Sequence, residues 1–192
     1  YMMSVGYDMY LKLLNDAVLE QQGKRSEIPP DCAADLTVSA YIPERYVPAA
    51  EQRMDLYRRI AALRTDEEAA ELTDELLDRY GDVPQPVTAL LNVALLRASA
   101  AKAGVSDITQ RGTQLIFSFG PQPDIAAVAA VCGMAAYRQR LQLSAAAQPK
   151  LTLYLQPKED ALSAAGKLVE ELALRYEEPA QTKAGECKEE QA

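Results

Sequence analysis

The segment from Glu71 to Gly81, ELTDELLDRYG, restricts the fold more than any other stretch of this 192-residue chain. Just before it, Thr65 precedes Glu68 by three residues, the capping-box spacing that starts a helix. Apolar residues then recur at steps of three and four, and Gly81 stands where helices commonly end in a left-handed residue. The pattern predicts an amphipathic helix over about 66–80 with a buried stripe of Ala69, Leu72, Leu76 and Tyr80.

Two further helices are expected on either side of this one. The helix after Pro48 would bury a face made of Met54, Tyr57, Ile60 and Ala61. Pro84 and Pro86 open the other helix, and Gly104 closes it. Its many small residues indicate close packing, so we place it centrally, with a stripe of Val87, Leu90, Leu91, Ala94, Ala98 and Ala101.

Strand patterns alternate irregularly with the helices. Alternating apolar residues predict a strand over 36–42, and a hairpin is expected from 105–110 and 113–119 around Arg111-Gly112, with Leu115, Phe117 and Phe119 on one face. Further strands are expected over 138–143 and 151–155. Short apolar stripes predict two more helices, marked by Ile125, Val128, Ala129 and Cys132, and by Leu162, Ala165, Val169 and Leu172. Because regular βαβ alternation is missing, we predict the α+β class, with a helical N-terminal part packed with a small mixed or antiparallel sheet.

The two ends of the sequence differ from its middle. Tyr7, Tyr10, Leu11, Leu14 and Val18 predict a helix over about 5–22, and the polar stretch 23–31 with two prolines reads as a linker. Residues 177–192 are acidic and hold no apolar cluster, so a disordered tail is expected there. The predicted organisation is therefore an N-terminal helix and linker (1–30), a folded domain (31–176) and an acidic tail (177–192).

Composition argues against most catalytic and metal chemistry. The chain has no histidine, which removes the commonest general base and the usual zinc ligand. Neither Gly166-Lys167 nor Gly23-Lys24 fits a phosphate-binding loop, and Cys132 reads as a core thiol rather than a nucleophile. We therefore predict no catalytic residue, no metal ligand and no cofactor for this chain.

Charge and cysteine usage indicate the class of partner and the compartment. The net charge is −8, whereas a domain that grips a phosphate backbone usually carries the opposite sign, so a basic protein partner fits better. Three widely spaced cysteines argue against a disulfide framework and fit a reducing compartment. No apolar run approaches the roughly 18 residues of a membrane span, and the start has no signal pattern. We expect a cytoplasmic protein.

The acids on the predicted 66–80 helix fall into two groups, those of the first turn and those that follow it. Asp66, Glu67 and Glu68 suit the positive end of a helix dipole. The later acids continue along the helix at three- and four-residue steps with one local cation, so they form either a solvated face or a docking site for an incoming Arg or Lys. The candidate contact residues are Glu71, Asp74, Glu75, Asp78 and Arg79.

The order of these segments resembles a known family. The stretches DLTVSAYIPERYV, RMDLYRRIA and ELTDELLDRYGDVPQPVTALLNVALLRASAAKAGV are similar to the carboxy-terminal region of bacterial transcription-repair coupling factor (Mfd). VGYDMYLKLLNDAV is similar to the segment that follows the motor of that family. The likeness runs over about 5–174, is strongest between Asp35 and Val105, and is looser over the strands from 111 to 155.

The resemblance implies a role in DNA repair. The parent would be an ATP- and Mg-dependent translocase on double-stranded DNA, a helicase-like hydrolase that removes stalled RNA polymerase and recruits the nucleotide-excision repair protein UvrA. Residues 1–30 would be the end of the motor, and 31–176 a regulatory domain. That domain would be autoinhibitory, packing on the UvrB-like N-terminal domain and masking its UvrA-binding surface, while DNA and RNA polymerase would be reached only through the parent.

Two other functions remain open at this stage. The chain could mediate self-association, with the helix over 87–103 protected in the assembly. It could also be a nucleic-acid accessory domain, which would use exposed basic residues: Arg53, Arg58, Arg59, Arg138 and Arg140. Arg53, Arg58, Arg59 and Arg64 have a further reading, as the local counterweight to the acidic helix.

Overall fold

The computed structural model describes residues 32–120, 123–144 and 148–182, so the predicted helix over 5–22 and the linker after it lie outside the described residues. The chain divides into two compact units, Tyr1–Ala98 and Ser99–Ala192, which we call the helical unit and the sheet unit. The division falls inside the stretch 31–176 that we expected as a single regulatory domain. In the described part, no helix is long and apolar enough to cross a membrane.

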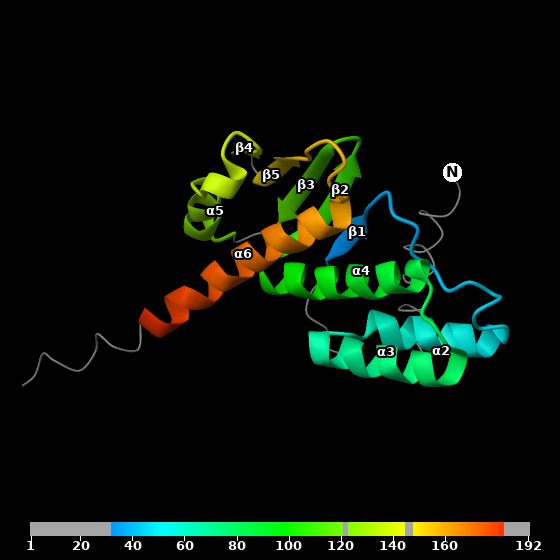
Figure 1. The fold of residues 1–192 in the computed structure, drawn as a ribbon. Helices are drawn as coiled ribbons and strands as arrows, with labels where there is room; N and C mark the ends of the chain where they lie inside the picture. The colour runs from blue at the N-terminus through cyan, green and yellow to red at the C-terminus, as the bar shows by residue number, and fades with distance from the viewer. Residues whose placement is uncertain (1–31, 121–122, 145–147, 183–192) are drawn as a thin grey trace, which may run out of the picture. The chain divides into compact units, whose positions relative to one another are not determined.

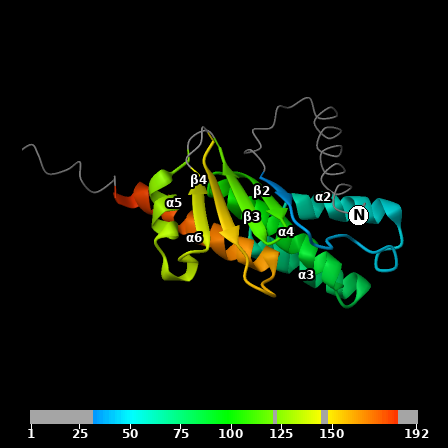
Figure 2. The ribbon, with the colours of Figure 1, turned by 90° about the horizontal axis from the view of Figure 1, so that it is seen from above.

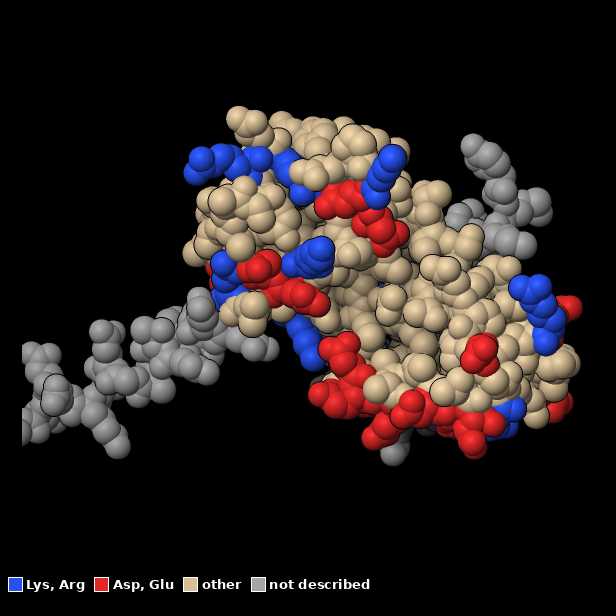
Figure 3. Space-filling view, in the orientation of Figure 1, with Lys and Arg blue, Asp and Glu red and all other residues tan. Residues whose placement is uncertain are grey.

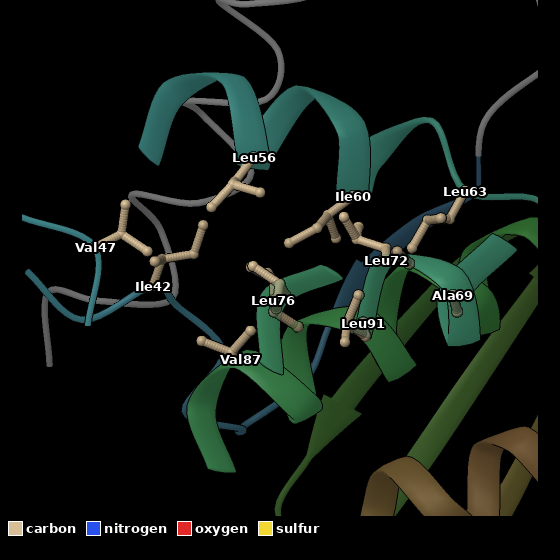
Figure 4. Packing of buried hydrophobic residues seen from close by; sticks show 12 residues of the cluster. Ile42, Val47, Leu56, Ile60, Leu63, Ala69, Leu72, Leu76, Val87 and Leu91 are labelled. Atoms are coloured by element: carbon tan, nitrogen blue, oxygen red, sulfur yellow. The ribbon is translucent and has the colours of Figure 1, made fainter. Parts of the chain in front are cut away.

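The helical unit is built from a short strand and three helices: β1 (Ala33–Asp35), α2 (Ala50–Ala61), α3 (Asp66–Tyr80) and α4 (Gln85–Lys102), which begins in this unit (Figure 1). Their apolar side chains point toward one another in a single cluster (Figure 4). Each helix contributes to it, and the loop before α2 adds Ile42 and Val47. The main helical contributors are Leu56, Ile60, Ala69, Leu72, Leu76, Val87, Leu90 and Leu91.

The three predicted helices are confirmed, with one change of face. Ala69, Leu72 and Leu76 are buried on α3 as expected. On α2, however, the buried residues are Leu56 and Ile60, whereas Met54 and Tyr57 are only half-buried. The predicted buried face of α2 was therefore partly wrong: it included Ile60 correctly but named Met54 and Tyr57 in place of Leu56.

The predicted strand over 36–42 is wrong. Its backbone groups bond elsewhere: Val38 N donates to Leu36 O (2.9 Å), Tyr41 N to Pro86 O (3.2 Å), and Ile42 N to the Tyr57 hydroxyl (2.8 Å). The segment is therefore an irregular connection that is hydrogen-bonded to the start of α4 and to α2. Leu36 and Ile42 are buried, which explains why apolar residues recur here without a strand.

The sheet unit is an antiparallel sheet with helices. Its elements are β2 (Val105–Arg111), β3 (Gln114–Phe119), α5 (Ile125–Cys132), the 3-10 turn η1 (Ala135–Tyr137), β4 (Leu141–Ser144), β5 (Lys150–Tyr154) and α6 (Ala161–Thr182). The strand order is β2-β3-β5-β4 (Figure 2). The predicted hairpin is confirmed, because Arg111 pairs with Gln114 and Gly112 takes a φ of 60° in the turn.

The core of the sheet unit is formed by apolar side chains of β3, β5 and α6. Leu115, Phe117 and Phe119 are buried as expected, together with Leu151, Leu153, Ala165, Leu168, Val169 and Leu172. On α6, the Tyr176 hydroxyl accepts a hydrogen bond from the backbone N–H of Asp124 (2.6 Å), the residue that caps α5. Tyr176 also packs so closely on Gly104, at φ 72°, that a Cβ there would lie 3.0 Å from the hydroxyl.

Three details of the sheet unit differ from expectation. α5 buries Ala127, Val128 and Val131, whereas the predicted stripe residue Ile125 is 49% exposed. β4 begins only at Leu141, because η1 and the positive φ of Gln139 (64°) turn the chain just before it. α6 continues to Thr182, so residues 177–182, expected in the tail, are helical, and 183–192 lie outside the described residues. The α+β class is confirmed.

Candidate interaction surface

The start of α3 is fixed by the predicted capping box. Glu68 N donates to the Thr65 hydroxyl oxygen (3.2 Å), and Thr65 N donates to Glu68 Oε2 (3.3 Å). Arg64 N donates to the same carboxylate oxygen (2.7 Å), so this side chain satisfies two amides ahead of the helix. The helix therefore starts at a defined residue, and the direction of every later side chain follows from it.

The end of α3 is held by an aromatic side chain from the connection before α2. The Tyr46 hydroxyl lies 3.2 Å from both Leu76 O and Gly81 O, and it can donate its hydrogen to these carbonyls at the end of the helix. Its ring packs on Tyr80 with centroids 5.6 Å apart. Burial, followed by the nearby Tyr80 and Asp82, raises the pKa of Tyr46. No pattern in the sequence indicates this contact.

Glu75 is the centre of an ion-pair network between α2 and α3. Arg59 holds both of its oxygens, with Nη1 to Oε1 at 2.9 Å and Nη2 to Oε2 at 2.5 Å, and Arg79 Nη1 reaches Oε1 at 2.9 Å. These hydrogen bonds, from Arg59 first and then Arg79, lower the pKa of Glu75 to about 2. Arg79 also lies over the Tyr80 ring, 5.2 Å from its centroid. Two of the five candidate contact residues are thus engaged with the helical unit itself.

The other three candidates lie next to Glu75 on the same side of α3, but outside this network. Glu71, Asp74 and Asp78 are exposed, as is Glu67, and none of them forms an ion pair among the described residues. At 3.6 residues per turn these four positions form one line along the helix. Figure 3 shows acidic side chains gathered over α3. We call Glu67, Glu71, Asp74 and Asp78 the acidic stripe.

An apolar side chain that the sequence patterns overlooked lies beside the acidic stripe. Leu77 follows the buried Leu76 and is 50% exposed, one of the few large apolar residues exposed in the described part of the chain. The sequence could have indicated this exposure, because Leu77 falls outside the apolar stripe of the helix. A shallow hollow of about 200 Å³ lies near Arg79 and is lined by Glu51, Gln52, Asp55, Leu56, Arg79 and Tyr80.

Most of the arginines named for a nucleic-acid surface form hydrogen bonds or ion pairs inside the fold. Arg53 donates to Val47 O and Pro48 O and pairs with Glu44, and Arg140 pairs with Glu159. With Arg59 bound to Glu75, three of the five arginines named for a nucleic-acid surface already have partners. Only Arg58 and Arg138 of that set are exposed, which weakens the nucleic-acid alternative.

The helix proposed for self-association is also used inside the chain. The apolar residues of α4 are mostly buried, while its exposed positions are Gln85, Thr88, Asn92 and Lys102. Within the described residues, no group of three or more His, Cys, Asp or Glu side chains is arranged to hold a metal ion.

Comparison with known proteins places α3 and its surroundings in a family. The family model of the TRCF domain matches residues 36–129, which include the acidic stripe. The chain contains a TRCF domain. The predicted resemblance to the carboxy-terminal region of transcription-repair coupling factor is thereby confirmed.

Curated relatives of the TRCF domain are transcription-repair-coupling factors. The chain is 32% identical over 121 residues to that of Staphylococcus epidermidis, covering 62% of this chain and 10% of that protein. For Bacillus subtilis the identity is 36% over 108 residues, covering 56% and 9%, and for Mycobacterium tuberculosis 36% over 116 residues, covering 55% and 9%. The chain thus spans about a tenth of the length of these relatives.

A solved structure shares the fold of the TRCF-domain chain. The crystal structure of the C-terminal domain of transcription-repair coupling factor matches with a TM-score of 0.62 at 22% identity. The match covers 78% of this chain and 97% of that one. The fold described above is therefore that of the carboxy-terminal domain, and the match does not include the motor of that family.

Proposed function

We propose that this chain is a non-catalytic, autoinhibitory interaction domain of an ATP-dependent DNA translocase that removes stalled RNA polymerase and recruits nucleotide-excision repair. In this proposal the acidic stripe of α3 binds an arginine-bearing surface of the UvrB-like N-terminal domain of the same protein. The contact masks the surface that UvrA binds. The names of the relatives support the link to transcription and repair.

The observation that carries the proposal is that Glu75 forms ion pairs within the helical unit, whereas the acids of the acidic stripe form none among the described residues. Glu75 has two arginines within its own unit, whereas Glu71, Asp74 and Asp78 have no ion pair among the described residues. Like charges at i,i+3 and i,i+4 spacing repel one another, so an incoming arginine relieves repulsion as well as forming a pair. Leu77 beside the stripe would add apolar area to the same contact.

The rigid display of the stripe supports specific docking. Thr65 with Glu68 fixes the start of α3, and Tyr46 fixes its end. Because the backbone that carries the acids is already ordered, binding loses little conformational freedom in this unit. Charges on such a surface favour specificity for a complementary partner.

The same surface is suited to release. An exposed ion pair contributes only about 0–1 kcal/mol, so a contact made of a few such pairs can open when the motor changes conformation. Opening would be a shift between closed and open populations rather than an unfolding event. Polar interfaces of modest size are typical between domains of one chain that move.

The test is a triple charge reversal, Glu71→Lys, Asp74→Lys and Asp78→Lys, in the full-length parent protein. We expect UvrA binding and basal ATPase activity to rise, because the contact that masks the UvrA-binding surface is lost. Glu75 is left unchanged, since its removal would disturb the α2–α3 ion pairs. The matched control is Glu170→Lys, which reverses an exposed acid on α6.

Two results would contradict the proposal. If the triple variant leaves UvrA binding and basal ATPase unchanged, the acidic stripe is not part of an inhibitory contact. If Glu170→Lys raises both to the same extent, a general change of charge explains the effect. Hydrogen exchange gives a second measurement, because the exposed face of α3 should lose protection when an ATP analogue and DNA engage the motor.

A further inference from the structure

β4 lies at the end of the sheet in the sheet unit. The strand order β2-β3-β5-β4 gives it one neighbour, β5, and Figure 2 shows it at the margin of the sheet. Among the described residues, no other strand pairs with it. The outer side of β4 therefore presents an edge of backbone donors and acceptors.

The register of the sheet identifies the groups on this edge. Tyr154 N donates to Arg140 O (2.8 Å), so this pair is hydrogen-bonded, and Gln142 with Thr152 and Ser144 with Lys150 follow at two-residue steps. Residues between them point their N–H and C=O groups the other way. Leu141 and Leu143 therefore offer two donors and two acceptors at the outer edge, with no backbone partner in the described part of the chain.

The side chains of the same two residues are incompletely covered. Leu141 is opposite Leu153 and Leu143 is opposite Leu151, so both point to the core face of the sheet. Leu151 and Leu153 are fully buried, whereas Leu141 and Leu143 are only half-buried. The apolar layer of this unit thus ends short of its last strand.

Proteins usually protect an open strand edge. The common devices are a very short strand, a charged residue or a proline in the strand, a bulge, and a covering helix or loop. β4, with the sequence LQLS, is only four residues long and contacts α5, but it has neither charge nor proline, and its pairing with β5 is regular. The neighbouring α5 also leaves Ile125, Ala126, Ala129 and Ala130 exposed, which continues the apolar character of this region.

We propose that the outer edge of β4 is a strand-addition site for an extended peptide of a partner protein. The peptide would bond Leu141 and Leu143 through its backbone and place apolar side chains at every second position on the core face. An acidic flank is expected, because β4 and β5 carry no acid and the exposed Arg138 and Lys150 lie at their ends. This site is separate from the acidic stripe and does not depend on the function proposed for it.

A peptide fits this edge better than a second copy of the chain. Pairing β4 with β4 would join two four-residue strands, and stable protein interfaces bury roughly 1,200–2,000 Å² in total. A second copy would also bring another Arg138 to a site that is already basic. An acidic, extended peptide avoids this repulsion between like charges.

The experiment titrates the full chain with a fluorescein-labelled peptide, ETVTVTE, followed by anisotropy. We expect saturable binding, and we expect N-methylation of the backbone amides on one edge of the peptide to weaken it by about tenfold or more. N-methylation on the other edge should change it little, because a strand pairs through alternate amides. No binding at millimolar peptide, or equal loss from both methylated series, would overturn the proposal.

Amide exchange by NMR tests the position of the peptide. Bound peptide should protect the amides of Leu141 and Leu143, while those of Gln142 and Ser144 change little because they already pair with β5. Protection elsewhere alone would refute the site. Protection of Leu141 and Leu143 without peptide, rising with protein concentration in step with the sedimentation mass, would replace the peptide by a second copy.

A pair of variants separates backbone from side chain at the same residue. Leu143→Ala and Leu143→Pro both remove the half-buried side chain, but only proline removes the outward N–H. We expect Leu143→Pro to bind the peptide about tenfold more weakly than Leu143→Ala. Equal affinities of the two folded variants would contradict strand addition, and the methylated peptides test the wild-type chain if Leu143→Pro does not fold.

Discussion

The two units of this chain differ in the kind of chemical group that they leave available. In the helical unit, side chains of Thr65, Glu68 and Tyr46 satisfy the ends of α3, and carboxylates are left facing solvent. In the sheet unit, the backbone ladder runs from β2 to β4 and stops at unpaired N–H and C=O groups. In the two proposals, a partner of the helical unit is recognised by charge and one of the sheet unit by strand pairing. Salt should weaken the first contact far more than the second.

Replacing the largest core residue of the sheet unit should have the largest effect. Phe117→Ala removes a fully buried ring from β3, and such changes cost about 3–5 kcal/mol. The free energy of unfolding is measured by urea titration, and amide exchange reports which unit loses protection. We expect the loss in β2, β3 and β5, with α3 keeping its wild-type exchange rates.

The matched change in the helical unit is Leu76→Ala, at a position on α3 that is 1% exposed. It should cost about 2–5 kcal/mol and affect exchange in α2 and α3 first. If either variant lowers amide protection equally in both units, the two units unfold together. The expectation that each unit unfolds by itself is then wrong.

The sequence predicted elements where local patterns decide the structure. The Thr65–Glu68 box and Gly81 define α3 within a few neighbouring residues, and Gly112 with the alternating residues of β3 defines the hairpin. Residues 36–42 alternate as well, but their backbone bonds lie on Pro86 and Tyr57, far along the chain. No local pattern reveals such partners, so a strand was expected where an irregular connection is found.

Removing the N-terminal cap of α3 should have a smaller effect than removing core residues. Thr65→Ala deletes the oxygen that accepts from Glu68 N, and loss of such a cap costs about 1 kcal/mol. Thr73→Ala is the control on the same helix, since its hydroxyl bonds Ala69 O in mid-helix and contributes little. Urea unfolding should show destabilisation by Thr65→Ala alone, and equal effects would mean that the box does not anchor the helix.

The Glu75 network makes the stability of the helical unit depend on pH. The pKa of Glu75 falls from 4.5 to about 2 on folding, so its contribution to stability is complete above pH 4.5 and is lost as the pH falls through about 2. Glu75→Gln should therefore destabilise the unit at neutral pH, and the difference from wild type should vanish as the pH falls below about 2. A difference that stays constant with pH, measured as the urea midpoint, would show that the Glu75 charge is not what matters.

The candidate site shows where sequence reasoning reaches its limit. The helical period put Glu71, Asp74, Glu75 and Asp78 on one side of α3, away from Leu72 and Leu76. It could not separate Glu75 from the others, because the separation comes from Arg59, sixteen residues earlier on α2. Only the packing of α2 against α3 shows which acid is already satisfied and which three are not.

The smallest expected effect concerns the acidic stripe itself. Asp74 lies three residues after Glu71 and four before Asp78, so Asp74→Asn should stabilise the chain by about 0.2–0.5 kcal/mol through lost repulsion. Asp66→Asn is the control with opposite sign, because Asp66 begins the first turn and interacts favourably with the helix dipole. Both differences, measured by urea unfolding, should shrink in 1 M salt. If Asp74→Asn instead destabilises the chain, the stripe serves the fold. If it stabilises, these charges cost the fold stability, as expected for groups whose role lies in contact with a partner.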